Sequence, residues 1–353
     1  MMVNRYLTSE VLKPSVVIFG LLVLLFTGFS WVAFLGEAVN SLLPVSMIFT
    51  LIVLKVGISL ELLMPISLYF GIILGVGRLY ADSEMKALMA SGISPYQVLT
   101  PVFALSCLVA VLVGGFSLYL RPLAYERSYQ LKAEGEAGFQ ISNIDAGHFY
   151  ERNGGSLVFF AEEIDQKRNK LSRVFVQSEH GNNLRVISAK EAEEHIDSQS
   201  GISIPVLLDG VEYQFTREGD ITHISSFSRL AINPRPIQAE YKRKASSTQN
   251  LMHSNARKDI AELQWRLSTP FSTVLLALLA VPLSRAAPRQ GKYAKIFTAT
   301  VVFAAYYFLG LMIKSFIDEA TISVFPGIWS IVIGFGVLLV FLLTSSKFAK
   351  GMS

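Results

Sequence analysis

The sequence predicts a polytopic α-helical membrane protein with six transmembrane helices, in which an antiparallel β-sandwich or jelly-roll domain is inserted between helices 3 and 4. The chain has 353 residues, of which 52% are apolar and only 16% are charged, whereas soluble domains carry about 25% charged residues. The charges are concentrated in residues 121–266, which hold 19 of the 31 Lys and Arg residues and 20 of the 27 Asp and Glu residues. This central segment alternates polar and apolar residues as β-strands do, while the flanking segments are continuously apolar.

A helix needs about 20 mostly apolar residues to cross a bilayer, and five segments meet this requirement directly. They are Val16–Phe34, Leu99–Leu120, Leu267–Ser284, Ile296–Ile313 and Ala320–Ser346. Residues 38–77 are also apolar, apart from Lys55 and Glu61. We expect a single crossing there at about Val56–Gly77, preceded by an interfacial segment Leu42–Leu54, because two crossings would each have only about 17 residues. The predicted total is six spans.

The distribution of Lys and Arg in the short loops predicts the orientation of the chain. Ten cations would lie on one side, which the positive-inside rule assigns to the cytoplasm. They are Arg5, Lys13, Arg78, Lys86, Arg285, Arg289, Lys292, Lys295, Lys347 and Lys350. The opposite short loops contain Lys314 against Glu37, Asp318 and Glu319. Both termini are therefore expected in the cytoplasm and residues 121–266 outside, between transmembrane segments 1–120 and 267–353.

The segment 121–266 is predicted to begin and end with helices and to contain short strands between them. Residues Arg121–Gly138 would extend the third span as a polar helix, and a second helix would begin at about Leu251. Between them, β-branched and aromatic runs are separated by turn residues such as Asp209-Gly210. The predicted strands are Gly147–Tyr150, Ser156–Ile164, Leu171–Ser178, Leu184–Ala189, Ile202–Leu208, Val211–Thr216 and Thr222–Phe227. Regular short strands of this kind are typical of a sandwich or jelly roll of about 100 residues.

The sequence contains no motif that indicates catalysis or a cofactor. It has no Gly-x-Ser-x-Gly or His-Glu-x-x-His motif, and the Gly291-Lys292 pair is preceded by Ala286 where a P-loop requires glycine. The five histidines lack metal-ligand spacing, and the single cysteine, Cys107, excludes an internal disulfide. We therefore expect a protein that is not an enzyme and binds no metal. The net charge of +4 comes from cations that flank the spans and gives no reason to expect nucleic-acid binding.

A short amphipathic helix is predicted in the loop Arg78–Gln97, at about residues 82–92. Asp82 or Ser83 can cap its start, Glu84 favours the first turn, and Gly92 suits the position after its end. One apolar face would carry Met85, Leu88 and Met89. This face could dock into the groove of a cytosolic partner. It could equally rest on lipid or pack on the helices of its own chain.

Two groups of residues are candidates for binding a lipid. Lys314 ends the fifth span after Phe303, Tyr306 and Tyr307, so that a lone cation borders an aromatic helix. Such a cation could hold an anionic head group, but it could also be a lysine that extends to the interface above an aromatic belt. The outer half of the first span carries the second group, which consists of Phe26, Phe29 and Trp31. This second signal is weak, because any lipid-facing helix has similar residues.

Several segments of the chain resemble the LptF/LptG family of lipopolysaccharide export permeases. They are Arg5-Tyr6-Leu7, Leu79–Gly92, Glu262–Arg266, Val281–Ser284 and Pro288–Gly291. The resemblance extends over essentially the whole chain, and the Arg-Tyr-Leu start and Lys314-Ser315 are more like the F-type than the G-type members. It implies a location in the bacterial inner membrane, with the β domain in the periplasm.

The resemblance also implies partners and roles. Members pair as heterodimers, here with an LptG-type permease, on a dimer of a cytosolic LptB-type ABC ATPase. Together they extract lipopolysaccharide and pass it to periplasmic β-jellyroll proteins of the LptC and LptA type. The residues implied as the ATPase-coupling helix are Asp82, Glu84, Met85, Leu88 and Met89. The first and fifth spans would line the lipid cavity with Lys314 facing the lipid phosphates, although Trp31-Val32-Ala33 stands where members often have a basic residue.

Three other functions remain open from the residues alone. A permease of another ABC system for lipids or lipoproteins would also combine membrane helices with an external domain. A non-transporting anchor of an envelope assembly is a second alternative. An intramembrane hydrolase is disfavoured, because Lys55 and Glu61 lie six residues apart and do not form a pair on one helix face.

Overall fold

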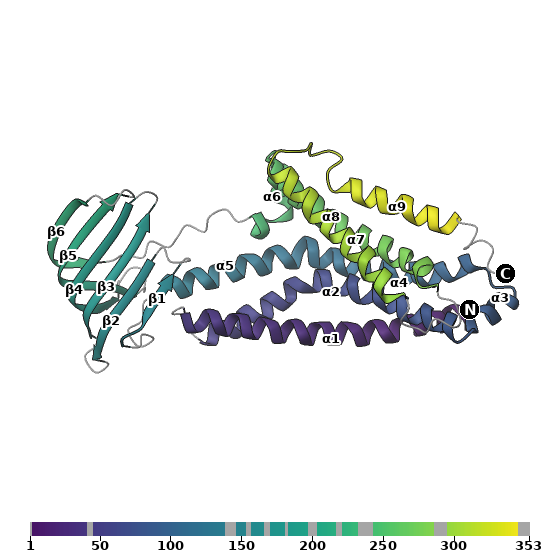
Figure 1. Ribbon diagram of the computed structural model, residues 1–353, viewed down its shortest axis with the longest axis horizontal. Helices are drawn as coiled ribbons and strands as arrows, with labels where there is room; N and C mark the ends of the chain where they lie inside the picture. The colour runs from purple at the N-terminus through teal and green to yellow at the C-terminus, as the bar shows by residue number, and fades with distance from the viewer. Residues whose placement is uncertain are drawn as a thin grey trace. The chain divides into compact units, whose positions relative to one another are not determined.

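The computed structural model describes residues 2–40, 45–137, 146–152, 157–165, 170–180, 183–196, 203–216, 221–231, 243–285 and 295–344. The chain divides into two compact units (Figure 1). The helical unit consists of Met1–Gly28, Leu54–Glu126 and Tyr241–Ser353, and the sheet unit consists of Phe29–Val53 and Arg127–Glu240. Each unit is described separately below.

The described residues before and after the sheet form mainly helices. The first group is α1 (Met2–Asn40), α2 (Val45–Ala81), α3 (Glu84–Ala90), α4 (Leu99–Gly115) and α5 (Arg121–Ala137), with a π-helical turn, Phe116–Leu120, between α4 and α5. The second group is α6 (Thr248–His253), α7 (Arg257–Leu283), α8 (Ile296–Asp318) and α9 (Trp329–Thr344). Among the described residues, five helices are long and apolar enough to cross a membrane, and α9 is apolar but shorter. The polytopic helical class is therefore confirmed.

Two helix boundaries differ from the sequence prediction. The expected interfacial segment Leu42–Leu54 is wrong from residue 45 onward, because α2 runs without interruption from Val45 to Ala81. Val45–Leu54 contains no Gly or Pro that would end a helix. The last apolar run is shorter than expected, because α9 begins only at Trp329. Pro326 has no backbone N–H, and Gly327 has a positive φ of 55°, so the chain turns before this helix starts.

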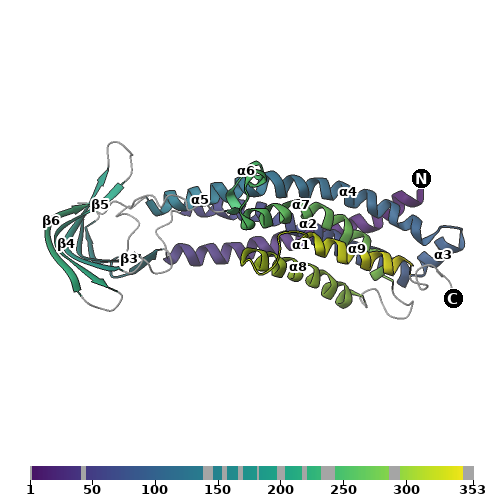
Figure 2. The same cartoon turned by 90° about the horizontal axis from the view of Figure 1, so that it is seen from above.

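Helix α7 is central to the helical unit and contacts α4, α8 and α9, which run beside it in Figures 1 and 2. Its small buried residues, including Ala277 and Ala280, permit close packing. Helices α1 and α2 also approach closely at two glycines. A Cβ on Gly71 would lie 1.9 Å from Ser15 Oγ, and one on Gly75 would lie 2.4 Å from the Glu10 carbonyl oxygen. The spacing of four residues places both glycines on the face of α2 that meets α1.

The sheet unit contains six antiparallel strands in the order β1-β2-β3-β4-β5-β6. They are β1 (Phe149–Arg152), β2 (Leu157–Asp165), β3 (Lys170–His180), β4 (Asn183–Ile196), β5 (Ser203–Thr216) and β6 (Ile221–Ala231). Figure 2 shows the sheet as a curved layer. Its buried side chains, among them Leu171, Val174, Ile187 and Leu207, form one apolar cluster.

An antiparallel β domain is confirmed, but its described strands are connected more simply than in a jelly roll. Each strand pairs with the next strand in the chain, whereas Greek-key connections would place non-consecutive strands side by side. The predicted turn at Asp209-Gly210 is also wrong, because β5 continues through it. Asp209 has a positive φ of 48°, and a Cβ on Gly210 would lie 2.6 Å from the Ser188 carbonyl oxygen and 2.4 Å from the Phe227 ring. Gly210 therefore serves the close packing of three strands rather than a turn.

Acid should weaken the contact between β4 and β5 at the pair Arg185–Glu212. Arg185 Nε and Nη2 donate to the buried Glu212 carboxylate at 2.5 and 2.7 Å, and this guanidinium holds the pKa of Glu212 below its usual range. Because the folded-state pKa is the lower one, the pair stabilises the fold above the pKa of the unfolded chain. This stabilisation is lost as the pH falls through the lowered value. Hydrogen exchange of β4 and β5 amides should therefore be faster in Glu212→Gln than in the wild type at pH 7, and the difference should disappear in acid, below the lowered pKa of Glu212.

The matched control for this prediction is Glu191→Gln in the same strand pair. Glu191 is an exposed carboxylate that pairs with Lys170 at 3.2 Å, and exposed pairs contribute little to stability. Its variant should exchange like the wild type at both pH values. A pH-independent difference for Glu212→Gln would contradict the role of its ionisation.

A buried charge cluster and the candidate coupling helix

Five ionisable side chains from four helices meet inside the helical unit. They are Glu61 of α2, Arg121 of α5, Glu262 and Arg266 of α7, and Lys314 of α8. Four of these side chains are less than 10% exposed and Lys314 is 17% exposed. Charges in such surroundings require partners, because their transfer out of water is expensive. We call these residues the charge cluster.

Arg121 joins the two carboxylates of the charge cluster. Its Nη1 lies 3.1 Å from Glu61 Oε1, and its Nη2 lies 3.1 Å from Glu262 Oε1. The hydroxyl of Ser117, within the π-helical turn, donates to Glu61 Oε1 at 2.9 Å. Thr269 Oγ1 of α7 lies 3.4 Å from the same oxygen. Glu61 therefore accepts hydrogen bonds from α5 and from the π-helical turn, as expected for a carboxylate inside an apolar helix.

Arg266 is fully buried and fixes the segment that leads into α7. Its Nε donates to Glu262 Oε1 at 3.2 Å, within one helical turn. Its two Nη atoms donate to the carbonyl oxygens of Arg243, Lys244 and Ser246 and to Thr248 Oγ1. Three of these acceptors belong to or follow the short 3-10 helix Arg243–Ala245. The guanidinium thus replaces the water that these backbone carbonyls would otherwise bind.

Lys314, which the sequence suggested as a lone cation for a lipid phosphate, has a partner in this structure. Its Nζ donates to Glu262 Oε2 and lies 5.5 Å from the centre of the Trp265 ring. Sequence reasoning missed this pair and the roles of Arg121 and Arg266. The spacing of Glu262 and Arg266, four residues apart on one helix face, was a signal that could have indicated a buried pair.

The aromatic residues that precede Lys314 divide between the interior and the surface. Phe303 and Tyr306 are buried, and Phe303 packs against Tyr69 and Tyr307 with ring centres 5.3 and 4.7 Å apart. Of the aromatic residues that the sequence suggested as lipid contacts on this helix, Phe303 and Tyr306 lie inside the bundle. The exposed face of α8 carries Phe297, Val301, Phe308, Leu311 and Met312.

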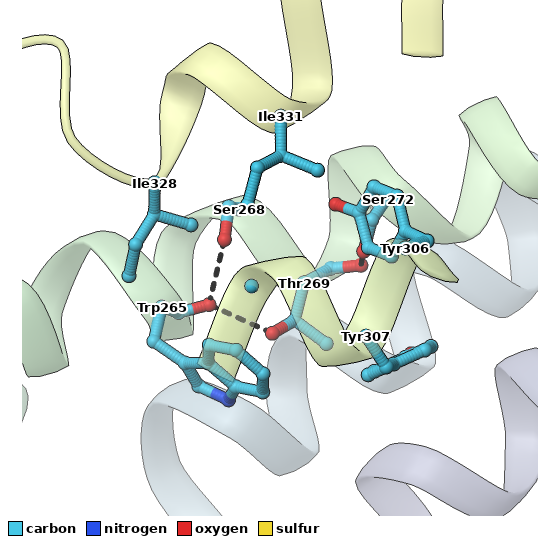
Figure 3. A pocket seen from close by; sticks show the side chains of 9 residues that line it. Trp265, Ser268, Thr269, Ser272, Tyr306, Tyr307, Ile328 and Ile331 are labelled. Carbon is cyan, nitrogen blue, oxygen red and sulfur yellow. Dashed lines mark hydrogen bonds between the residues drawn. The ribbon is translucent and has the colours of Figure 1, made fainter. Parts of the chain in front are cut away.

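A small pocket lies between α7, α8 and the start of α9 (Figure 3). Trp265, Ser268, Thr269, Ser272, Tyr306, Tyr307, Gly310, Ile328 and Ile331 line it. The hydroxyls of Ser268, Thr269 and Ser272 are bonded to carbonyls of their own helix, as the dashed lines in Figure 3 show. The pocket therefore has hydroxyl groups on one wall, but their donors are already used.

In the first helix, two of the three predicted lipid-contacting residues are exposed. Phe29 and Trp31 are exposed, whereas Phe26 is half-buried. Val17, Leu21, Leu24 and Val32 are exposed on the same helix. Much of α1 thus presents an apolar surface with no covering element among the described residues.

The short helix predicted in the loop after the second span is present as α3, Glu84–Ala90. Gly92 has the expected positive φ of 92°, but neither expected cap bonds to its start, since Ser83 is left-handed and makes no side-chain cap. Met85 is 1% exposed and belongs to the core of the helical unit. Leu88 and Met89 pack against the same core.

The exposed face of α3 is therefore its polar and small-residue face. Asp82, Lys86, Ala87 and Ala90 are exposed. Glu84 is half-buried because Tyr6 Oη of α1 donates to its carboxylate.

Arg78, near the end of α2, makes two further ion pairs, one with Glu10 of α1 and one with Asp82, four residues further along the chain. Arg78 Nη1 lies 3.5 Å from Glu10 Oε2, and its Nε lies 3.3 Å from Asp82 Oδ2. The tip of the bundle next to α3 is thus held by Tyr6, Glu10 and Arg78, together with buried Met85. Among the described residues, no group of three or more His, Cys, Asp or Glu side chains is placed to hold a metal ion.

Comparison with known proteins assigns the chain to a family. The family model described as lipopolysaccharide export system permease LptF/LptG matches residues 5–345. The chain is 24% identical over 324 residues to the lipopolysaccharide export system permease protein LptF of Escherichia coli (strain K12), covering 89% of this chain and 87% of that protein. The LptF proteins of Escherichia coli O157:H7 and Shigella flexneri match with the same identity and coverage. Because the family model spans the apolar helices and the sheet alike, the chain belongs to the LptF/LptG family of lipopolysaccharide export permeases.

Proposed function

We propose that this chain is the F-type membrane subunit of an ABC transporter that extracts lipopolysaccharide from the bacterial inner membrane. It would pair with an LptG-type permease on an LptB-type ATPase dimer and pass lipid to LptC- and LptA-type β-jellyroll proteins. The match of the family model to residues 5–345 carries this proposal. The chain would hydrolyse nothing itself and would provide the cavity wall and the lever.

The charge distribution supports an orientation with both termini in the cytoplasm. Arg5, Lys13, Arg78 and Lys86 would then lie on the cytoplasmic side together with α3. Lys314 and the charge cluster would lie toward the periplasm, as would the sheet domain. Glu61 is 20 residues from the end of α2, which is about 30 Å along a helix, so the charge cluster and α3 would be separated by roughly the thickness of a hydrocarbon core.

Lipid contact is proposed for the apolar surfaces of α1 and α8 and for Lys314. Phe29 and Trp31 of α1 and Phe308 of α8 are exposed, and Phe26 precedes Phe29 by one turn on α1. The buried aromatics Phe303 and Tyr306, with their neighbour Tyr307, would instead stiffen α8 from within the bundle. A lipid with several acyl chains needs about 0.8 kcal/mol per CH₂ group to leave a bilayer. Energy from ATP hydrolysis is therefore required. We propose that the ATPase transmits it to this chain through contact with α3.

For the ATPase contact, the proposed acidic residues are Asp82, just before α3, and Glu84, at its start. Met85, Leu88 and Met89 are proposed to transmit force, since they attach α3 to the core of the helical unit. A rigid attachment is what a lever requires, because a push on α3 then moves α1 and α2 as well. The apolar residues of α3 thus contact the bundle and the acidic residues contact the ATPase, whereas the sequence suggested that the apolar face docks into the partner.

The test is purification of the tagged chain from its native membranes, with native mass spectrometry of the complex. We expect an ATPase dimer, a second permease of the family and bound lipopolysaccharide. In Lys314→Gln, retained lipopolysaccharide should fall roughly tenfold with the same subunits present, because a charge-assisted hydrogen bond to a phosphate is lost.

Lys295→Gln is the matched control, since Lys295 precedes α8 at its other end. Its retained lipid should equal that of the wild type. A complex without an ATPase, or one that holds a lipoprotein in place of lipopolysaccharide, would contradict the proposed function. Equal lipid in Lys314→Gln and in the wild type would contradict the role of Lys314 alone.

A further inference from the structure

The charge cluster contains one more cation than it has carboxylates. Arg121, Arg266 and Lys314 face Glu61 and Glu262. A buried group of charges is most favourable when it is balanced, because an excess charge has no partner to offset its desolvation. The excess of one positive charge therefore identifies the cluster as a place where a further anion would be stabilised.

The three cations are not held equally. Arg121 forms ion pairs with two carboxylates, and Arg266 donates to one carboxylate and three backbone carbonyls. Lys314 pairs with Glu262 within the part of the chain that the structure describes and faces the Trp265 ring, while Asp318, one turn further along α8, pairs with Arg243 at 3.0 Å. If Lys314 turned away, the four remaining charges would balance as two cations and two anions.

The two oxygens of Glu262 separate these contacts. Oε1 lies 3.1 Å from Arg121 Nη2 and accepts from Arg266 Nε at 3.2 Å, whereas Oε2 accepts from Lys314. If the Lys314 side chain moved away from Oε2, both arginine contacts with Oε1 would thus remain. The Lys314 side chain is also 17% exposed, against 8% for Arg121 and 0% for Arg266. Lys314 is consequently the cation of the cluster that can reach a ligand at the surface.

We infer that Glu262 is an internal counter-anion. It pairs with Lys314 between transport cycles, and the lysine leaves it to pair with a phosphate of the lipid when lipid binds. The inference rests on the proposed function, which brings a phosphorylated lipid to Lys314. On loading, the lysine exchanges one anion for another and leaves the charge cluster balanced. When the lipid moves onward, Lys314 pairs with Glu262 again. Glu262 thereby lowers the affinity for lipid to a level that permits release.

The test compares two substitutions that remove the same charge from the same cluster. Glu262→Gln deprives Lys314 of its counter-anion, whereas Glu61→Gln removes a carboxylate that contacts Arg121 but not Lys314. Purified full complexes would be titrated with lipopolysaccharide and the bound lipid measured by native mass spectrometry. We expect roughly tenfold tighter binding and slower ATP-driven release in Glu262→Gln, since one charge-assisted bond no longer competes. Glu61→Gln should not tighten binding.

The double variant Glu262→Gln/Lys314→Gln tests whether the gain acts through the lysine, and it should bind as weakly as Lys314→Gln. Weaker or unchanged binding in Glu262→Gln would overturn the exchange, as would an equal gain in Glu61→Gln. If Glu262→Gln fails to assemble, Glu262→Asp keeps a carboxylate for the arginines but withdraws it from Lys314, and tighter binding is again expected. Failure of both variants to assemble would show a fixed structural bridge and would also overturn it. Wild-type binding by Lys314→Gln would instead reject the proposed lipid contact.

Discussion

Replacing Arg266 with methionine is expected to destabilise the helical unit by about 3 to 5 kcal/mol, because several buried acceptors lose their donor at about 1 to 3 kcal/mol each. The guanidinium is fully buried. Its partners are the Glu262 carboxylate, Thr248 Oγ1 and the carbonyls of Arg243, Lys244 and Ser246. Methionine would fill part of the volume but would leave these acceptors buried without donors. The segment before α7 that contains these carbonyls would then lose its hydrogen bonds to the helix.

Thermal unfolding of the purified chain, followed with a thiol-reactive dye at Cys107, measures this effect. The midpoint should fall by roughly 5 to 15 °C, given a few degrees per kcal/mol for a chain of this size. Arg257→Met is the matched control, because Arg257 is an exposed arginine on the same helix. Arg266→Lys should be intermediate, since an ammonium keeps the charge but cannot reach four separate acceptors. Equal midpoints for Arg266→Met and Arg257→Met would show that the hydrogen bonds contribute nothing measurable.

The sequence predicted the elements of this fold well because the membrane and the sheet each impose a simple pattern. Uninterrupted apolar runs predicted α1, α4, α7 and α8. Alternation predicted seven strands, two of which are the two halves of β5. The errors occurred where a local signal was overruled by packing. Asp209-Gly210 is a strong turn signal by itself, but Gly210 is needed where β5 passes Ser188 and Phe227. A single sequence does not show such a neighbour.

The candidate site was less predictable, because its contacts join residues that are far apart in the chain. Glu61 pairs with Arg121 across 60 positions, and Lys314 pairs with Glu262 across 52. The orientation of the α8 aromatics was ambiguous for a different reason. Lipid and the interior of a helix bundle are equally apolar, so Phe303 and Tyr306 suit either environment. Hydrophobicity therefore predicts that α8 lies in the membrane but not which face is covered.

Reversing the charge of Glu84 is expected to abolish lipid transport, with the complex still assembled. A lysine there would lie near Arg78 and would present the wrong sign to a partner that binds an acidic residue. Transport of lipopolysaccharide by the complex in proteoliposomes should fall to the background measured without ATP. Glu126→Lys is the matched control, since it reverses an exposed acidic residue on α5. Loss of the ATPase from the purified complex would also agree with a docking role, whereas undiminished transport would contradict it.

Tyr6→Phe separates the two contacts that Glu84 can make. In the structure the Tyr6 hydroxyl donates to the Glu84 carboxylate and thereby connects α1 to α3. If Glu84 serves mainly to hold these two helices together, removing the hydroxyl should reproduce most of the loss expected for Glu84→Lys. If Glu84 binds the ATPase, Tyr6→Phe leaves the carboxylate free and transport should decrease by no more than about threefold, the value of one neutral donor at a partly exposed site. We expect the second result, because Met85 and Arg78 continue to attach α3 to the bundle without the tyrosine hydroxyl.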